Sequence, residues 1–402
     1  MHGPELDRSN GGQGTEVKRD PQSSSLICQE RSGSRRPVFG ALVLAALIAL
    51  AACGDDAPTE PPASSRHDIL VLNSTGQTLA SFFVDGELIR TAGSPTDLGA
   101  GFDGDVVAVS RRYAVSSISS FGGSRLSIVD LVSGGVSQAT FPGPNAALVN
   151  PSRVTLDAGD TVWVGGRGSD AVYRLGPGAS EATLVAAGVG TFVERVVPGD
   201  GEVYAIDANL DDDGLTWAPL GPGRVVVLAR EGTVLETIDL PINALNPSDA
   251  VLASGRLIVL AGGTFDPVSF APNGDGALVS IDPVTRMVTS TRPLEANGTR
   301  IGLGSDGFVY VTTTTDFLSL DVLRFDPRTS SFDHGPANPI ATTDLAGNRV
   351  DCWTSTALED GRLLCATFRT DAPGRLLLLS STGEALSEIP SGFGTTDIGI
   401  RP

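Results

Sequence analysis

From residue 67 onward, apolar residues occur in short runs separated by turns rich in Gly, Pro and Asp. Residues 299–332 show the pattern most clearly. Three runs combine aliphatic, β-branched and aromatic side chains, which favour β-strands: they are 301–303, 308–312 and 322–325, with a last strand near Phe332. The intervening stretches at 305–307 and 326–329 carry typical turn residues. The stretch therefore predicts a meander of four short strands.

The same unit recurs along the chain. When the chain is aligned on the segment that enters each inner strand, the starting points lie about 50 residues apart, as in four-stranded propeller blades. These segments begin at Pro95, Pro151, Phe192, Pro247, Gly298, Asp351 and Thr395. The 49 glycines, the 26 prolines and only 5% aromatic residues suit many tight turns and exclude a helical bundle.

The two ends of the repeat region complement each other. Residues 68–72 have the pattern of a third strand and residues 79–83 that of a fourth, whereas the chain stops after a first strand at 397–400. One blade would then be built from both termini, which removes exposed sheet edges. We predict an all-β domain over residues 67–402, a seven-bladed β-propeller closed by the C-terminal strand joining the N-terminal blade. The composite blade lacks a clear second strand and is expected to have three strands.

The units Asp306–Thr312 and Asp326–Thr329 resemble those of the YVTN and NHL-like seven-bladed propellers of bacterial envelopes. The resemblance covers about residues 67–402 and is moderately specific for the fold. Such propellers include lactonases, lyases, protein-binding platforms and lipoproteins, so the resemblance implies a fold and leaves the function open.

The N-terminus predicts export. Arg31, Arg35 and Arg36 precede an apolar run over 38–50, which is too short to span a bilayer comfortably. The run ends in Leu50-Ala51-Ala52-Cys53-Gly54, which resembles the lipobox of bacterial lipoproteins. Residues 1–52 are then a leader and signal peptide, Cys53 carries lipid, and residues 53–66 form a Pro-rich tether. Gly54 after the cysteine favours the outer membrane, facing the periplasm or the cell surface. The alternative is a plain signal peptide or membrane anchor with an incidental cysteine.

The net charge of −19 argues against nucleic acid and anionic lipid surfaces as partners. Of the three histidines, His67 and His334 follow the leader, and neither has a second His or a Cys at ligand spacing. A histidine-based zinc or haem site is therefore not expected. No G-x-S-x-G, P-loop or Rossmann glycine pattern falls between a strand and a helix.

Residues that enter the inner strands are expected to ring the mouth of the central channel, the usual ligand site of a propeller. They are Asp97, Arg153, Glu194, Asp249, Arg300, Trp353 and Asp397. The alternative is that these charges pair with one another and only cap a solvated channel. Lactonase-like propellers hold a metal with acidic residues in the channel, but here the arginines would compete for the carboxylates.

Two further sites are predicted. Asn209, Asp211 and Asp213 have the N-x-D-x-D-G spacing of a calcium loop, although Leu220 stands where a bidentate Glu is expected. The alternative is an acidic, solvated loop. Cys352 and Cys365 are an even pair beyond the leader and are expected to form a disulfide in an oxidising periplasm. That bridge requires a bulge or a shifted turn, and the alternative is a buried thiol at Cys365 with a separate free Cys352.

Two functions follow. The first is a non-enzymatic one: a lipid-anchored, monomeric propeller that binds a protein, peptide or glycan partner. The second is a metal-dependent hydrolase or lyase, lactonase-like, that works in the central channel. Arginine–carboxylate pairs at the mouth would favour the scaffold, and carboxylates converging on a cation would favour the enzyme.

Overall fold

A computed structural model describes residues 66–99, 105–120, 123–211 and 218–402. The predicted leader 1–52, the lipidation site Cys53 and most of the tether lie outside these residues. In the described part the chain is all-β, apart from one turn of 3₁₀-helix, η1 (Ala146–Leu148). None of the helical structure there is long and apolar enough to cross a membrane.

The strands of the described residues form six sheets. The first contains, in spatial order, β29 (Thr395–Ile400), β1 (His67–Asn73), β2 (Thr78–Asp85) and β3 (Leu88–Thr91), with β4 (Thr96–Asp97) paired to β2. The second contains β5 (Val107–Val109), β6 (Tyr113–Ser120), β7 (Gly123–Asp130) and β8 (Val136–Thr140). Three more sheets have four strands each. One contains β17 (Pro247–Ala253), β18 (Arg256–Ala261), β19 (Ala277–Asp282) and β20 (Met287–Pro293), and the next contains β21 (Asn297–Leu303), β22 (Val309–Thr314), β23 (Leu320–Asp326) and β24 (Ser331–His334). The third contains β25 (Thr354–Ala357), β26 (Leu363–Ala366), β27 (Gly374–Leu379) and β28 (Ala385–Gly392).

The remaining sheet has eight strands and consists of two meanders. One is β9 (Pro151–Leu156), β10 (Val162–Gly166), β11 (Ala171–Leu175) and β12 (Thr183–Ala187), and the other is β13 (Val193–Pro198), β14 (Glu202–Asp207), β15 (Arg224–Ala229) and β16 (Val234–Asp239). The meanders join where β9 and β13 run parallel and Arg153 lies opposite Arg195.

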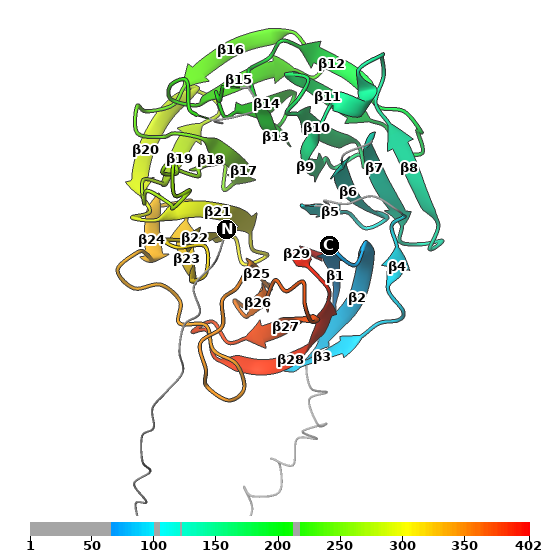
Figure 1. Cartoon of the computed structure of the whole chain (residues 1–402), viewed down its shortest axis with the longest axis vertical. Coiled ribbons are helices and arrows are strands. Elements are labelled where there is room, and N and C mark those ends of the chain that lie inside the picture. Colours follow the sequence, from blue (N-terminus) through cyan, green and yellow to red (C-terminus); the bar gives the residue numbers. More distant parts are fainter. Residues whose placement is uncertain (1–65, 100–104, 121–122, 212–217) are drawn as a thin grey trace, which may run out of the picture. The chain divides into compact units, whose positions relative to one another are not determined.

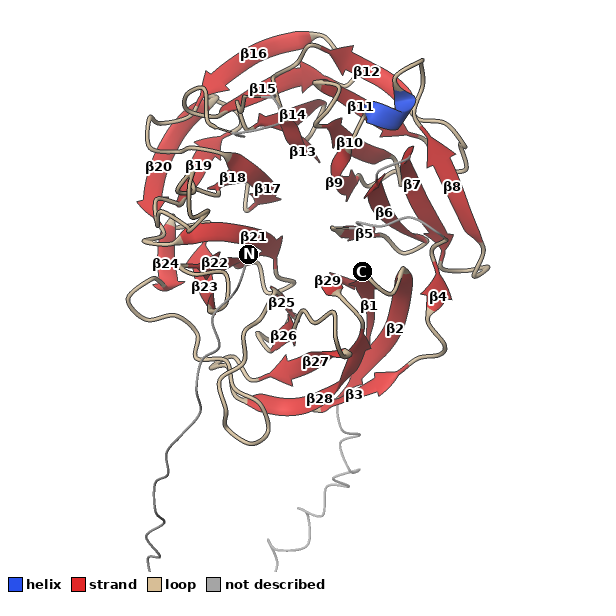
Figure 2. Ribbon diagram, viewed as in Figure 1, coloured by secondary structure: helices blue, strands red, loops and turns tan. Residues whose placement is uncertain are grey.

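The sheets are arranged around a central axis, as in a β-propeller (Figures 1 and 2). The inner strands β5, β9, β13, β17, β21, β25 and β29 surround the centre. The second strand of a sheet, such as β22, is covered on all sides and is buried throughout. The outermost strand, such as β20, faces water on one side and is largely half-buried or exposed. The predicted turn at 305–307 is present, with Gly307 at a φ of 83° that other residues resist.

The core lies between neighbouring sheets. Val311 and Phe325 of one sheet pack with Ile258, Leu260 and Leu278 of the preceding sheet in a single buried cluster. Each meander therefore buries its apolar faces only against its neighbours, and burying such side chains contributes about 1.5–3 kcal/mol apiece.

The first and last strands of the described residues meet in one sheet, where β29 pairs antiparallel with β1 and Val71 lies opposite Ile398. The predicted positions of the N-terminal strands in the strand order of their sheet are wrong. Residues 68–72, expected as a third strand, lie in the second strand β1, and residues 79–83 lie in the third strand β2. The sheet path has four strands and not three, because β3 supplies the fourth. An apolar run shows that a strand exists, but only its pairing shows where the strand lies in the order of the sheet.

Candidate functional site

Charged residues gather where the inner strands begin. We call them the central cluster: Asp105, Arg153, Arg167, Glu194, Arg195, Asp249, Arg300 and Asp397. Four carboxylates thus meet four guanidiniums. The structure brings together five of the seven residues predicted at the channel mouth (Arg153, Glu194, Asp249, Arg300 and Asp397) and adds Asp105, Arg167 and Arg195.

Asp249 is shared by two arginines. Its side chain is 2% exposed, and Oδ2 accepts a hydrogen bond from the Arg153 guanidinium. The other oxygen, Oδ1, lies 3.5 Å from Arg195 and accepts from the Ala250 amide at 2.9 Å. Nearby carboxylates raise the pKa of Arg153 even though burial opposes its charge, whereas burial lowers the pKa of Arg195. Asp249 therefore compensates Arg153 more strongly than Arg195.

Arg300 and Asp105 form a second pair. The Arg300 guanidinium donates to the Asp105 carboxylate and, at 2.8 Å, to the Asp105 backbone carbonyl. Arg153 lies 3.9 Å from the same carboxylate. Burial alone would raise the pKa of Asp105, but Arg300, Arg153 and Arg167 hold it well below its ordinary value. Asp105 is thus ionised at neutral pH and links two arginines.

Glu194 and Asp397 are held differently. Arg167 donates twice to Glu194 Oε2, at 2.8 and 2.6 Å. Asp397 accepts from the Val107 amide at 2.9 Å and from the Thr354 hydroxyl at 3.2 Å. Burial raises the pKa of both carboxyls, and nearby arginines offset only part of this effect. The ionised forms of Glu194 and Asp397 are therefore stabilised less than the ionised form of Asp105.

A cavity of about 290 Å³ lies among the inner strands and is called the central cavity. Its charged lining is Arg153, Arg195, Asp249, Arg300 and Asp397. Its other walls combine aliphatic side chains, such as Val251, with hydroxyl groups, such as that of Ser355. A mixed cavity of this size is at the lower end of the range for small-molecule sites.

A β-bulge explains why the sequence missed Arg195. The register of the inner strands shifts between Val193 and Arg195, between Pro247 and Asp249, and between Gly298 and Arg300. The extra residue in β13 is Glu194, so the structural equivalent of Asp249 and Arg300 there is Arg195. Nothing in the apolar pattern indicates a bulge, although the charge at Arg195 was visible next to Glu194.

Asp97 does not join the central cluster, and its predicted position is wrong. It is exposed, pairs with Thr78 in the edge strand β4, and accepts a hydrogen bond from the Gly99 amide at 2.8 Å. Figure 1 shows β4 at the outer rim. The first strand of that repeat is β5, so the alignment that began at Pro95 was one strand early.

Trp353 lies beside the central cluster and lines a second site. Its ring contacts Phe368, with ring centroids 4.9 Å apart, and lies 6.0 Å from the Arg300 guanidinium carbon. With Phe317, Leu318, Phe368, Arg349 and Arg369 it lines an open groove of about 630 Å³, called the Trp353 groove. Leu318 is 80% exposed and Phe317 49%. Phe317 also stacks on Phe265, at 5.5 Å, which extends the apolar surface to the neighbouring sheet.

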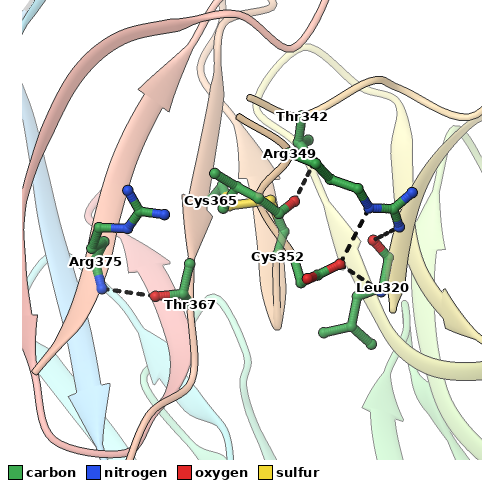
Figure 3. The surroundings of a disulfide bond; sticks show 9 residues. Leu320, Thr342, Arg349, Cys352, Cys365, Thr367 and Arg375 are labelled. Atoms are coloured by element: carbon green, nitrogen blue, oxygen red, sulfur yellow. Dashed lines mark hydrogen bonds and ion pairs between the residues drawn. A yellow bond between two sulfur atoms is a disulfide. The ribbon is translucent and has the colours of Figure 1, made fainter. Parts of the chain in front are cut away.

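The predicted disulfide between Cys352 and Cys365 is confirmed. It joins the segment before β25 to β26, and both cysteines are fully buried. Around it, Arg349 donates to the Leu320 carbonyl at 3.2 Å, and Thr342 donates to the Val350 carbonyl at 2.6 Å (Figure 3). The disulfide therefore fixes the chain just before Trp353 and helps to shape the Trp353 groove.

The calcium hypothesis stays a prediction, because Asp213 lies outside the described residues. Asn209 is engaged locally: its side-chain nitrogen donates to the Pro222 carbonyl at 2.9 Å, and its oxygen accepts from Arg224 at 3.4 Å. Among the residues that the structure describes, no three His, Cys, Asp or Glu side chains are grouped so as to hold a metal ion.

Comparison with known proteins supports the fold. No family model matches the sequence, and no curated protein does. A solved structure of a proposed 6-phosphogluconolactonase from Bacteroides uniformis is 12% identical, with a TM-score of 0.53 over 83% of this chain and 99% of that one. A Lactobacillus plantarum protein is 13% identical, with a TM-score of 0.50 over the same shares. Virginiamycin B lyase from Staphylococcus aureus, 13% identical, has a TM-score of 0.49 over 72% of this chain and 84% of its own. The chain is a β-propeller protein, and identities this low carry the fold alone.

Proposed function

We propose that this protein is a non-enzymatic binding scaffold of the bacterial envelope. In this proposal the ring has seven blades: the eight-stranded sheet counts as two, and the pairing of β29 with β1 closes the circle. Lipid on Cys53 anchors the protein to the outer membrane, and the tether up to residue 66 separates the propeller from the bilayer. The buried disulfide supports an oxidising compartment.

The observation that carries the proposal is the Trp353 groove. Exposed apolar side chains from neighbouring sheets adjoin there, and contiguous patches of this kind mark interaction sites. Arg349 and Arg369 also line the groove and pair with exposed aspartates, so the charged part of the lining is roughly neutral. Aromatic and arginine side chains, which the groove combines, are enriched in protein interfaces. We therefore favour a protein or peptide over a glycan as the partner.

The central cluster favours the scaffold over the metal-dependent hydrolase or lyase. Asp105, Glu194 and Asp249 each accept hydrogen bonds from an arginine. A cation would have to displace these guanidiniums, at the cost of leaving positive charges buried without partners. Among the described residues, no carboxylates converge on one point as the lactonase-like alternative requires.

The test is cross-linking in envelopes of the source cell, followed by identification of the partner and reconstitution with the purified partner. We expect a Phe317→Ser/Leu318→Ser variant to lose the complex. A Val284→Ser variant is the matched control, because Val284 is 90% exposed in the β19–β20 turn and lies outside the groove. Equal capture by both variants would contradict the proposed surface. Lactone hydrolysis that requires a divalent cation and disappears in Asp249→Asn would favour the enzyme instead.

A further inference from the structure

Arg153 and Arg195 lie side by side at the centre of the ring. They face each other across the only described pairing between the parallel strands β9 and β13. Their side chains are 8% and 13% exposed, so water screens them weakly. Like charges directly opposite on neighbouring strands destabilise a sheet. Such a pair persists only where anions compensate it.

The compensation within the chain is incomplete. Asp249 is the one carboxylate within 4.0 Å of Arg195 in the described residues, and it already accepts a hydrogen bond from Arg153. The Nε atoms of both arginines are buried and have no hydrogen-bond partner among the described residues. Asp397 also lines the cavity, but an amide and a hydroxyl bind it, and burial raises its pKa. Its carboxylate therefore offsets little of the excess positive charge.

The walls of the central cavity suit an organic ligand. Val251, Ile301 and Ile398 present aliphatic surface. Ser355 also lines the cavity, and its buried hydroxyl has no hydrogen-bond partner in the described chain. The volume of about 290 Å³ corresponds to roughly ten water molecules at about 30 Å³ each. This space fits a compound of a few carbon atoms that carries one charge and a hydroxyl group.

We propose that the central cavity binds a small organic monocarboxylate with its carboxylate on Arg195. A guanidinium presents parallel N–H donors that match the two oxygens of a carboxylate. The carbon chain packs on Val251 and Ile301, and a hydroxyl group on the chain pairs with Ser355. Arg300 pairs with Asp105 and Arg153 with Asp249, so the excess of positive charge in the lining is confined to Arg195, which only shares Asp249. A monovalent anion neutralises that excess, whereas a phosphate dianion would overcompensate it. This site goes beyond the proposed partner docking and uses different residues.

Isothermal titration of the full-length protein tests this site, with acetate, lactate and gluconate as probes. Lactamide is the uncharged match for lactate, and inorganic phosphate is the divalent comparison. We expect lactate or gluconate to bind, with lactamide and phosphate inactive at about 10 mM, where millimolar complexes are largely formed. Loss of one hydroxyl partner weakens binding roughly three- to tenfold, so Ser355→Ala should do so.

Arg195→Gln should abolish carboxylate binding. Arg256→Gln is the control, because it removes the same charge from a residue that does not line the cavity and should leave the affinity unchanged. Because Arg195→Gln alters a buried cluster, its melting curve is measured as well, and Ser355→Ala supplies the milder variant. Absence of carboxylate binding to the native protein, equal binding of lactamide, tighter binding of phosphate, or unchanged affinity in a folded Arg195→Gln variant would each overturn the inference.

Discussion

Replacing Asp249 by Asn is the most informative perturbation of the central cluster. Asn has nearly the same shape, so the change removes a charge without opening a void. Arg153 and Arg195 then lose their shared carboxylate while their side chains remain 8% and 13% exposed. Breaking a buried ion pair on one side costs about 3–5 kcal/mol, since the remaining charge stays buried. We expect the free energy of unfolding to fall by about this amount, with Asp105, 3.9 Å from Arg153, moderating the loss.

Urea denaturation followed by circular dichroism measures the effect. Asp371→Asn is the control: its side chain is 75% exposed and pairs with Arg369 at 2.9 Å, and exposed pairs of this kind contribute little. Combining Asp249→Asn with Arg195→Gln should restore part of the lost stability, because the second change removes one uncompensated charge. If Asp249→Asn lowers the free energy of unfolding by less than about 1 kcal/mol, as an ordinary substitution does, Arg153 and Arg195 do not depend on Asp249 for charge compensation.

Three further predictions concern other parts of the molecule. Replacing both Cys352 and Cys365 by Ala should lower the free energy of unfolding by about 3 kcal/mol, because the bridge closes a loop with a sequence separation of 13 residues; an unchanged urea midpoint would contradict this. The depressed pKa of Asp105 means that it adds stability above its ordinary value of 3.8 and loses that contribution as the pH falls further. Acid titration of stability should therefore be shallower in Asp105→Asn than in the native protein between about pH 4 and pH 2, and parallel curves would show that its arginine partners do not act as described. Deleting residues 395–402 removes β29 and exposes the edge of β1, so the melting temperature should drop strongly, and an unchanged melt would argue against closure of the ring.

Much of the fold was predictable because its signals are local. The runs at 308–312 and 322–325 coincide closely with β22 and β23, and the turn at 305–307 has the expected glycine geometry. The disulfide was also predictable, since two cysteines remained beyond the leader and Cys53, the predicted lipidation site, and the compartment was inferred from the leader itself. These features depend on residue type and spacing within one meander.

The central cluster was only partly predictable. Adjacent residues in a strand normally point to opposite faces, so Glu194 and Arg195 were not both expected to join it. The bulge in β13 shifts the register by one residue and lets both of them contribute. Likewise, Asp97 and Asp105 both follow plausible turns, and only the pairing of β4 with β2 places Asp97 at the rim.

The sequence by itself determined that this protein is built from repeated four-stranded meanders, because strand periodicity and turn chemistry act over a few residues. The tertiary structure decided which charges meet at the centre, which arginines share Asp249, and which loops form the Trp353 groove. Those contacts join residues far apart in the chain, 195 positions between Arg300 and Asp105 and 290 between Asp397 and Val107. Their geometry depends on how the sheets are arranged around the axis and on single-residue bulges, and a local pattern of apolar and polar residues contains neither.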